Sequence, residues 1–484
     1  MSVFIGSSLW LLAWVSLQCF SIQPVFCSFY AYGTTHSSKF EVRTPDRVFA
    51  RTLSRSSHRA RPYLLSPGEN TDFFEAGNMA AEYSLDLSSH WIVESATLFY
   101  YSNPRVALFL SLGVAFLLYY LTTVTRKPTL VAKENGKFQR FLLENCPTLH
   151  ERYWPTPWCL STHMMTAAAN FMRSRVPKLP YQREIVELSD GGVVSLDWLD
   201  GGSGHQPIAF FMPGLTGCSQ AEYIRSIVPV AARLGCRCVV FNNRGRGGLG
   251  LRTPKMYCAL STGDLREVLE HVKRKYPESP IIATGISLGG MIMGHYLCET
   301  KDQALVSAVM LISTVYDVHR GTTSMETTGL NMILNRHLAR SLCGVVEPHK
   351  HLFINGLNMD RVLQSRTIRE FDEHFTSKLF GFGTAEKYYT DASLLGKLGS
   401  GVKVPTLCVA AADDMMAPAD ALPEAEAAES DYLALVVTSR GGHIGFMEGL
   451  LPQLPFFTER LYEQYVGALI GKLDGGKLAL QIKE

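Results

Sequence analysis

Residues 280–290 read PIIATGISLGG, a run of apolar residues that ends in the pattern Gly-x-Ser-x-Gly. A continuous apolar run that leads into a Gly-rich turn is typical of a strand buried inside a parallel sheet. Residues 291–298 continue as a helical segment. A sharp turn between a strand and a helix lifts a serine hydroxyl clear of the backbone, and glycines permit the close approach. The stretch therefore predicts a nucleophilic serine, Ser287, in an elbow flanked by Gly285 and Gly289.

The same design recurs along the chain. Short apolar runs that end in polar or Gly-rich residues lie at 207–217, 236–248, 404–414 and 433–443. Helical patterns separate these runs, as in 263–276, where apolar residues recur every three or four positions. Alternation of strands and helices implies a doubly wound, mostly parallel sheet with flanking helices. We therefore expect the α/β class, with an active site at the carboxyl ends of the strands.

Two later strand ends supply an acid and a base. Asp413 and Asp414 end the run at 404–414, and His443 follows the last apolar run between glycines. In chain order this is Ser, Asp, His, which is the order of an α/β-hydrolase triad. We favour Asp414 over Asp413 because Pro418 follows it four residues later, the usual spacing in these loops. The pattern predicts the α/β-hydrolase fold, in which His443 deprotonates Ser287 and the acid orients the imidazole.

The turn after the first central strand, residues 213–217, reads PGLTG. Loops at this place commonly supply one of the two backbone N–H groups that bind the oxyanion in such folds, and the residue after the nucleophile supplies the other. We therefore expect the backbone N–H groups of Leu215 and Leu288 to be the oxyanion donors.

One segment has the length and composition of a membrane span. Residues 106–125 contain no charged residue and lie between Arg105 and Arg126. Twenty helical residues cover the hydrocarbon layer of about 30 Å. A second apolar run at 3–20 is similar to the apolar part of a signal peptide but lacks a positively charged start. We expect a single-pass protein of an internal membrane such as the endoplasmic reticulum, without assigning the catalytic domain to one face.

These segments predict a domain organisation. The N-terminal extension reads as largely disordered, with Met79 as an alternative start. We expect, in chain order, an N-terminal extension (1–105), a transmembrane helix (106–125), a membrane-proximal segment (126–180), the hydrolase domain (181–470, with a helical cap at about 315–390) and a C-terminal tail (471–484).

Composition argues against several other classes of protein. The 484 residues carry a net charge of +2, which gives no electrostatic footprint for nucleic acid. The 11 cysteines are scattered without a Cys-x-x-Cys pair, and no metal-ligand cluster or nucleotide loop is present. We expect neither a metal nor any other cofactor, and a membrane and its lipid as partners.

Several motifs together resemble one known family. They are MPGLTG (212–217), VVFNNRG (239–245), TGISLGGM (284–291), TIREFDEHFTS (367–377), YYTDAS (388–393), AADD (411–414) and TSRGGHIGFMEG (438–449). In these motifs the chain resembles the AB hydrolase 4 family of the α/β-hydrolase superfamily, which includes the YheT-type esterases. The resemblance implies a single membrane segment before the hydrolase domain and a triad of Ser287, Asp414 and His443. It also implies phospholipase activity that releases a fatty acid from phosphatidylcholine.

Our leading hypothesis is a serine carboxylic-ester hydrolase of the phospholipase A1 type that works through an acyl-enzyme. Three alternatives stay open at this point. The same triad could transfer the acyl group to another alcohol, or could hydrolyse short- or medium-chain acylglycerols. The chain could also be a membrane scaffold that keeps the fold without turnover.

Overall fold

The computed structural model describes residues 91–199, 205–353, 356–474 and 477–478. In sequence, the chain divides into two units at Gly113 and Val114, and the second unit holds the central sheet. The predicted start at Met79, the apolar run at 3–20 and most of the N-terminal extension lie outside the described residues, as do residues 479–484 of the tail.

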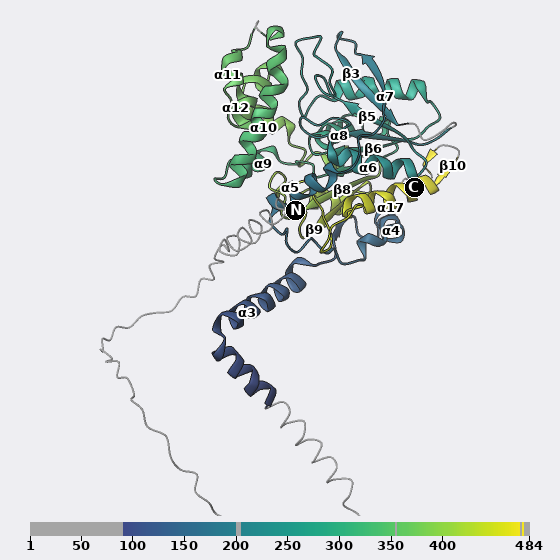
Figure 1. Ribbon diagram of the computed structural model, residues 1–484. Helices are drawn as coiled ribbons and strands as arrows, with labels where there is room; N and C mark the ends of the chain where they lie inside the picture. Colours follow the sequence, from purple (N-terminus) through teal and green to yellow (C-terminus); the bar gives the residue numbers. More distant parts are fainter. Residues whose placement is uncertain (1–90, 200–204, 354–355, 475–476, 479–484) are drawn as a thin grey trace, which may run out of the picture. The chain divides into compact units, whose positions relative to one another are not determined.

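A nine-stranded sheet forms the centre of the second unit (Figure 1). Its spatial order is β1-β9-β8-β7-β6-β4-β5-β3-β2. The strands from β9 to β5 in this order are parallel, whereas β1, β3 and β2 pair antiparallel at the two edges. The mostly parallel sheet predicted from the sequence is confirmed.

The strands are β1 (Thr129–Val131), β2 (Gln182–Glu187), β3 (Val193–Leu199), β4 (Ile208–Met212), β5 (Arg237–Asn242), β6 (Ile281–Ile286), β7 (Ala308–Ile312), β8 (Thr406–Ala411) and β9 (Leu433–Thr438). A separate pair follows, β10 (Leu473–Asp474) with β11 (Lys477–Leu478).

Helices cover both faces of this sheet. The longer ones are α4 (Lys137–Asn145), α5 (Thr162–Ser174), α6 (Glu222–Arg233), α7 (Thr262–Lys275), α8 (Leu288–Thr300) and α17 (Phe457–Gly471), and α16 (Glu424–Glu429) is short. Single-turn helices are η2 (Pro147–Leu149), η3 (Lys301–Gln303) and η6 (Ala419–Ala421). Side chains of α7 and α8 belong to one hydrophobic core, and those of α4, α6 and α17 belong to a second.

Double burial explains why the sequence of strand β6 is almost entirely apolar. Ile281 and Ala283 pack into the core that contains α7 and α8, whereas Ile282 and Ile286 pack into the core on the opposite face. Successive side chains of a strand point to opposite faces, so a strand covered on both sides has no place for an exposed residue. The continuous apolar run is a consequence of this double burial.

A helical insertion separates β7 from β8, and Figure 1 shows its helices α9 to α12 grouped beside the sheet. The sequence predicts a cap in this part of the chain, at about 315–390, with helical stretches at 330–342 and 359–371. The insertion contains α9 (Val318–Met325), α10 (Leu330–Val346), η4 (Glu347–Leu352), α11 (Met359–Leu363), α12 (Ile368–Phe371), η5 (Asp372–Thr376), α13 (Ser377–Leu379), α14 (Ala385–Ala392) and α15 (Leu398–Gly401).

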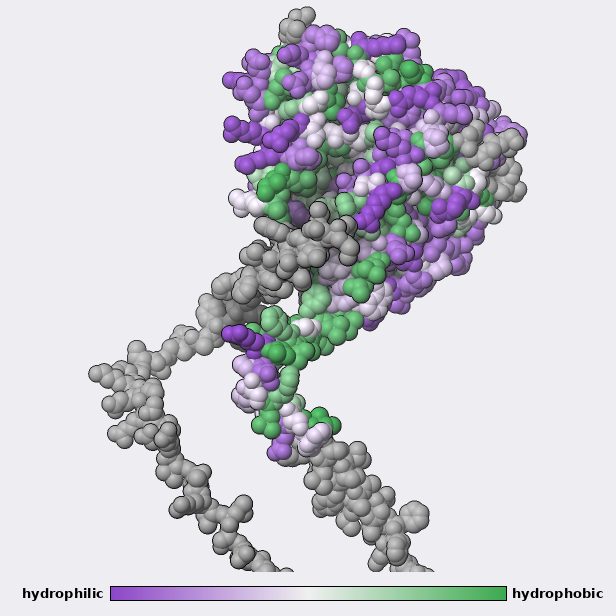
Figure 2. All heavy atoms as spheres, in the orientation of Figure 1, coloured by the Kyte–Doolittle hydropathy of each residue, from purple (hydrophilic) through white to green (hydrophobic). Residues whose placement is uncertain are grey.

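An apolar helix precedes β1. It consists of α3 (Pro104–Tyr119) and a π-helical turn, η1 (Tyr120–Val124), and residues 91–102 are also helical. The helix Pro104–Val124 has 21 residues and contains an 18-residue stretch with a mean hydropathy of 2.0, so it is long and apolar enough to cross a membrane. Figure 2 shows hydrophobic side chains, in green, along much of this helix. The span that the sequence predicts at 106–125 therefore falls on a helix of suitable length.

Candidate active site

The loop between β6 and α8 forms a sharp elbow with Ser287 at its tip. Ser287 has φ 54° and ψ −119°, a backbone conformation that residues other than glycine rarely adopt. The flanking glycines leave room for the turn. A Cβ at Gly285 would lie 2.6 Å from Cα of Gly290, and one at Gly289 would lie 2.6 Å from the carbonyl oxygen of Pro213. Neither distance is possible for a real side chain, so the pattern Gly-x-Ser-x-Gly follows from close backbone packing.

Three predicted side chains come together at this elbow. Nε2 of His443 lies 2.9 Å from Oγ of Ser287, and Nδ1 of His443 lies 2.9 Å from Oδ2 of Asp414. The exposed fractions are 5% for Ser287, 8% for His443 and 3% for Asp414, so all three are shielded from bulk water. The backbone N–H groups of Met416 and Ala417 donate to Oδ1 of Asp414 and fix the carboxylate in place.

Asp413 takes a different position from Asp414. Its Oδ1 accepts a hydrogen bond, at 2.9 Å, from the backbone N–H of Gly442. Gly442 directly precedes His443 in the chain. Its Oδ2 is buried without a hydrogen-bond partner in the described part of the chain. Burial raises the pKa of Asp413 to about 6. Of the two acids that the sequence left open, only Asp414 contacts the imidazole, and Asp413 holds the loop that carries it.

The loop around His443 also depends on α5, a helix that no sequence motif connects with the site. The backbone N–H of His443 donates to Oγ1 of Thr166, at 3.0 Å, and the N–H of Ile444 donates to Oγ of Ser313. Gly442 has φ +57°, and a Cβ there would lie 2.7 Å from Oγ1 of Thr166. Thr166 and His443 are 277 positions apart in the chain, which explains why no local pattern could reveal this contact.

Comparison with known proteins places this geometry in a family. Residues 210–450 match the family model described as the alpha/beta hydrolase fold. The chain is 38% identical to human phospholipase ABHD3 over 379 residues, which cover 77% of this chain and 92% of that protein. The chain belongs to the alpha/beta hydrolase family. The family that its motifs predict is confirmed, and the protein is a hydrolase of the esterase type.

Two further relatives cover a similar length. Protein abhd-3.2 of Caenorhabditis elegans is 32% identical, and the match covers 75% of this chain and 97% of that protein. Mouse monoacylglycerol lipase ABHD2 is 27% identical, and the match covers 72% of this chain and 87% of that protein.

The backbone of this hydrolase offers two N–H groups beside Ser287. Leu288 is the first residue of α8, and an N–H group at a helix start has no acceptor within the helix. In the turn after β4, Gly214 donates to the hydroxyl of Tyr223 and Thr216 donates to that of Tyr257. Leu215, between them, has no hydrogen-bond acceptor among the described residues. Leu215 and Leu288 also line the same cavity as Ser287.

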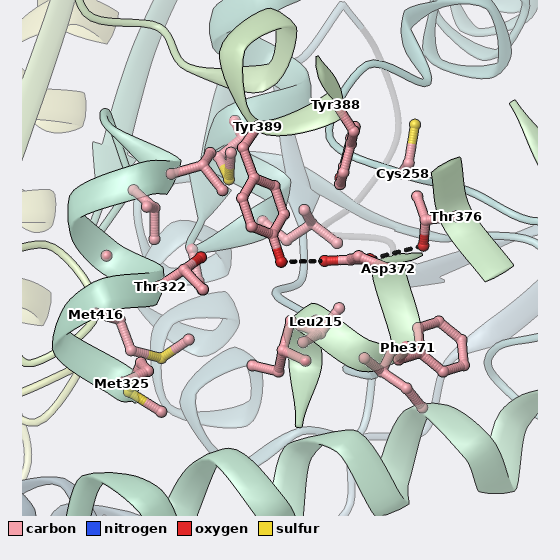
Figure 3. A pocket seen from close by; sticks show the side chains of 18 of the residues that line it. Leu215, Cys258, Thr322, Met325, Phe371, Asp372, Thr376, Tyr388, Tyr389 and Met416 are labelled. Carbon is pink, nitrogen blue, oxygen red and sulfur yellow. Dashed lines mark hydrogen bonds between the residues drawn. The ribbon is translucent and has the colours of Figure 1, made fainter. Parts of the chain in front are cut away.

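That cavity is lined both by the elbow and by the helical insertion, and Figure 3 shows it from close by. Its walls are mostly apolar, and side chains from several elements contribute to them. Among the lining residues are Leu215, Met256, Met291, Val318, Met325, Leu342, Ile368, Phe371, Phe375 and Met416. A cavity of this composition suits a hydrocarbon chain bound next to the serine hydroxyl.

One acid lies in the apolar wall. Figure 3 shows Asp372 between Tyr389 and Thr376, and both hydroxyl groups donate to its carboxylate, at 3.0 and 2.7 Å. Burial raises the pKa of Asp372 to about 6. The residue belongs to the motif TIREFDEHFTS, but the sequence alone assigns it no role, because an acid in a helical stretch looks like any solvated residue.

A second cavity reaches the triad at His443. Its lining includes His443 but not Ser287, and Met416 lines both cavities. Helices α5 and α10 supply most of its wall. Among the described residues, no group of three or more His, Cys, Asp or Glu side chains is placed to hold a metal ion.

Proposed function

We propose that this hydrolase cleaves a carboxylic ester of a membrane phospholipid, with Ser287 as nucleophile, His443 as general base and Asp414 as the acid that orients His443. Phosphatidylcholine is the proposed substrate, with the cleavage of a phospholipase A1. The observation that carries the proposal is the chain of hydrogen bonds from Ser287 through His443 to Asp414 at the wall of an apolar cavity. The names of two relatives, a phospholipase and a monoacylglycerol lipase, agree with a lipid ester as substrate.

The proposed reaction has two halves. Oγ of Ser287 attacks the ester carbonyl while Nε2 of His443 takes its proton, and the N–H groups of Leu215 and Leu288 bind the oxyanion. The imidazolium then gives the proton to the departing alcohol oxygen, which leaves an acyl-enzyme. In the second half a water molecule replaces the alcohol. His443 takes its proton, the fatty acid departs, and the proton returns to Ser287.

The two cavities suggest how the substrate lies. The acyl carbonyl has to reach Leu215 and Leu288, which line the cavity beside Ser287, so the acyl chain occupies that cavity. The departing alcohol has to reach Nε2 of His443 to receive a proton. It therefore occupies the second cavity, which His443 lines.

Exposed apolar side chains support action at a membrane. Tyr120, in the last turn of the apolar helix, donates to the carbonyl of Pro155, and its ring lies 6.2 Å from that of Trp154. Trp158 beside them donates to the carbonyl of Leu450, so two loops are joined at the end of this helix. These loops expose Trp154, Trp158, Leu450, Leu451 and Leu454. Tryptophan and leucine side chains at this position are suited to the interfacial layer of the bilayer that the helix crosses.

The test uses the full chain, purified and reconstituted with phosphatidylcholine. Mass spectrometry would follow release of fatty acid and lysophosphatidylcholine. The proposal expects activity that disappears in Ser287→Ala and persists in Ser174→Ala, which changes an exposed serine at the end of α5. Activity that survives in Ser287→Ala would overturn the assignment of the nucleophile.

Two further measurements separate the alternatives. Added alcohols would yield transesterified lipid if the enzyme were an acyltransferase. Failure of Ser287 to react with a fluorophosphonate would favour a non-catalytic scaffold.

A further inference from the structure

A further hollow lies on the helical insertion, and Ser287 does not line it. It is formed by one side of α10 and by the turn that joins α11 to α12. The residues that line it are Arg336, Arg340, Cys343, Leu363, Gln364, Ser365 and Arg366.

The hollow is strongly cationic. Arg336, Arg340 and Arg366 are exposed, and among the described residues none of their guanidinium groups has an ion-pair or hydrogen-bond partner. Two acids lie nearby, but neither lines the hollow. Glu370 accepts from the backbone N–H of Arg366, and Glu347, at the end of α10, acts on the Cys343 thiol through its charge. Three positive charges thus share one concave surface without a carboxylate in it.

Two of the three arginines lie on the same face of α10. Arg336 and Arg340 are four residues apart, so they lie one turn apart on the same face of α10. Like charges at this spacing destabilise a helix unless something lies between them. A guanidinium group presents a planar set of N–H donors that matches the oxygens of a phosphate group.

We propose that this hollow binds a phosphate-bearing anion, held by Arg336, Arg340 and Arg366. The ligand is either a soluble phosphate compound or the phosphate of an anionic lipid headgroup, since both present the same oxygens to the arginines. The anion neutralises the repulsion between the guanidinium groups and links two segments of the chain, α10 and the turn at 363–366.

Helix α10 and helix α12, which directly follows the turn, also form walls of the cavity beside Ser287. Asn335 and Leu342 of α10 line that cavity, while Arg336 and Arg340 line the hollow on another side of the same helix. After the turn, Ile368 returns to the cavity, and its backbone N–H donates to Oδ1 of Asn335, at 2.8 Å. The thiol of Cys343 on α10 also donates to the carbonyls of Val362 and Ser365. An anion in the hollow therefore strengthens a connection between α10 and the segment 362–368 that these hydrogen bonds already make. Binding should make the region 359–371 more rigid.

The first experiment measures thermal unfolding of the full chain in detergent micelles as pyrophosphate is added at constant ionic strength. The test variant is R336Q/R340Q/R366Q. The control, R233Q/R252Q/R274Q, removes the same charge from three exposed arginines outside the insertion. We expect the midpoint of the wild type and of the control to rise, and the test variant to need at least about tenfold more pyrophosphate for the same rise. An equal rise in the test variant would overturn the proposal.

The second experiment separates the two sources of phosphate by hydrogen exchange of residues 359–371. The full chain is reconstituted in nanodiscs of phosphatidylcholine, with either soluble pyrophosphate or phosphatidic acid in the bilayer. Slower exchange with pyrophosphate alone assigns a soluble ligand, and slower exchange with phosphatidic acid assigns a lipid headgroup, provided that R336Q/R340Q/R366Q loses the effect. Unchanged exchange under both conditions would contradict the site.

Discussion

The carboxylate of Asp414 lies 2.9 Å from Nδ1 of His443, although Asp413 is its direct neighbour in the chain. The contact leaves Nε2 of His443 free to accept the proton of Ser287, because a carboxylate at Nδ1 fixes the tautomer with hydrogen on that nitrogen. Asp413 instead holds the backbone of Gly442. Two adjacent acids therefore have separate tasks, one on the imidazole and one on the loop beneath it.

Replacement of each acid by its amide should separate these tasks. Asp414→Asn should lower kcat by about 10⁴, because the amide favours the wrong tautomer of His443 while it keeps the size of the side chain. Asp413→Asn should leave kcat within a few-fold of the wild type. Ester hydrolysis by both variants under saturating substrate checks this. A large loss in Asp413→Asn with a small one in Asp414→Asn would reverse the assignment.

Asp413 should also leave a signature in the pH dependence of stability. Its pKa in the folded chain is about 6, compared with an ordinary value of 3.8, so the folded state retains a proton that the unfolded state has lost. The free energy of unfolding should therefore fall as the pH rises from about 4 to above 6, by roughly 2–3 kcal/mol from this group. Above that range both states are ionised and the contribution stays constant.

Denaturant unfolding at pH 5 and pH 8 provides the measurement. The difference in unfolding free energy between the two pH values should be smaller in Asp413→Asn than in the wild type. Asp360→Asn, which changes an exposed acid on α11, should keep the wild-type difference. An identical pH dependence in all three proteins would show that Asp413 does not titrate in this way.

The central strands and the turn at Ser287 could be predicted because each depends on residues that are close together in the sequence. The apolar run of β6 and the glycines around Ser287 reflect burial on two faces and close backbone packing, so both were visible in the sequence. The edge strand β1 was not predicted, since Thr129–Val131 is three residues long and gains its partner, β9, only in the folded chain. The contact of Thr166 with the loop at His443 could not be predicted for the same reason. Such contacts depend on tertiary packing and have no repeat that a sequence could display.

The elbow itself can be tested through Gly289. In Gly289→Ala the new Cβ would overlap the backbone carbonyl of Met212, which has little freedom to move. We expect a loss of stability of about 1–3 kcal/mol and a fall in kcat of about 10² or more, because the start of α8 and the N–H of Leu288 have to shift. Thermal unfolding and hydrolysis rates measure both effects.

A matched glycine provides the control. Gly344 lies in α10, and no side chain or neighbouring element lies within 4 Å of the position that a Cβ would take there, so Gly344→Ala should keep full activity. It should stabilise the protein by up to about 1 kcal/mol, since alanine favours a helix more than glycine does. If Gly289→Ala behaved like Gly344→Ala, close packing at the elbow would not be the reason for its glycine.

Asp372 should make binding of a long acyl chain depend on pH. With a pKa of about 6, its carboxyl group is mostly neutral at pH 5 and ionised at pH 8, and an acyl chain that displaces water from the cavity leaves the ion poorly solvated. Asp372→Asn keeps a side chain of the same size between Tyr389 and Thr376 but removes the charge. We expect the variant to have a lower KM than the wild type for long-chain esters at pH 8 and the same KM at pH 5. Short-chain esters should show little difference at either pH because they leave water around Asp372.

The comparison of KM between the variant and the wild type at each pH cancels the titration of the triad, and Asp360→Asn controls for a change of net charge. An unchanged KM ratio across pH and chain length would mean that the acyl chain does not reach Asp372 and that the wall formed by η5 lies beyond the bound substrate.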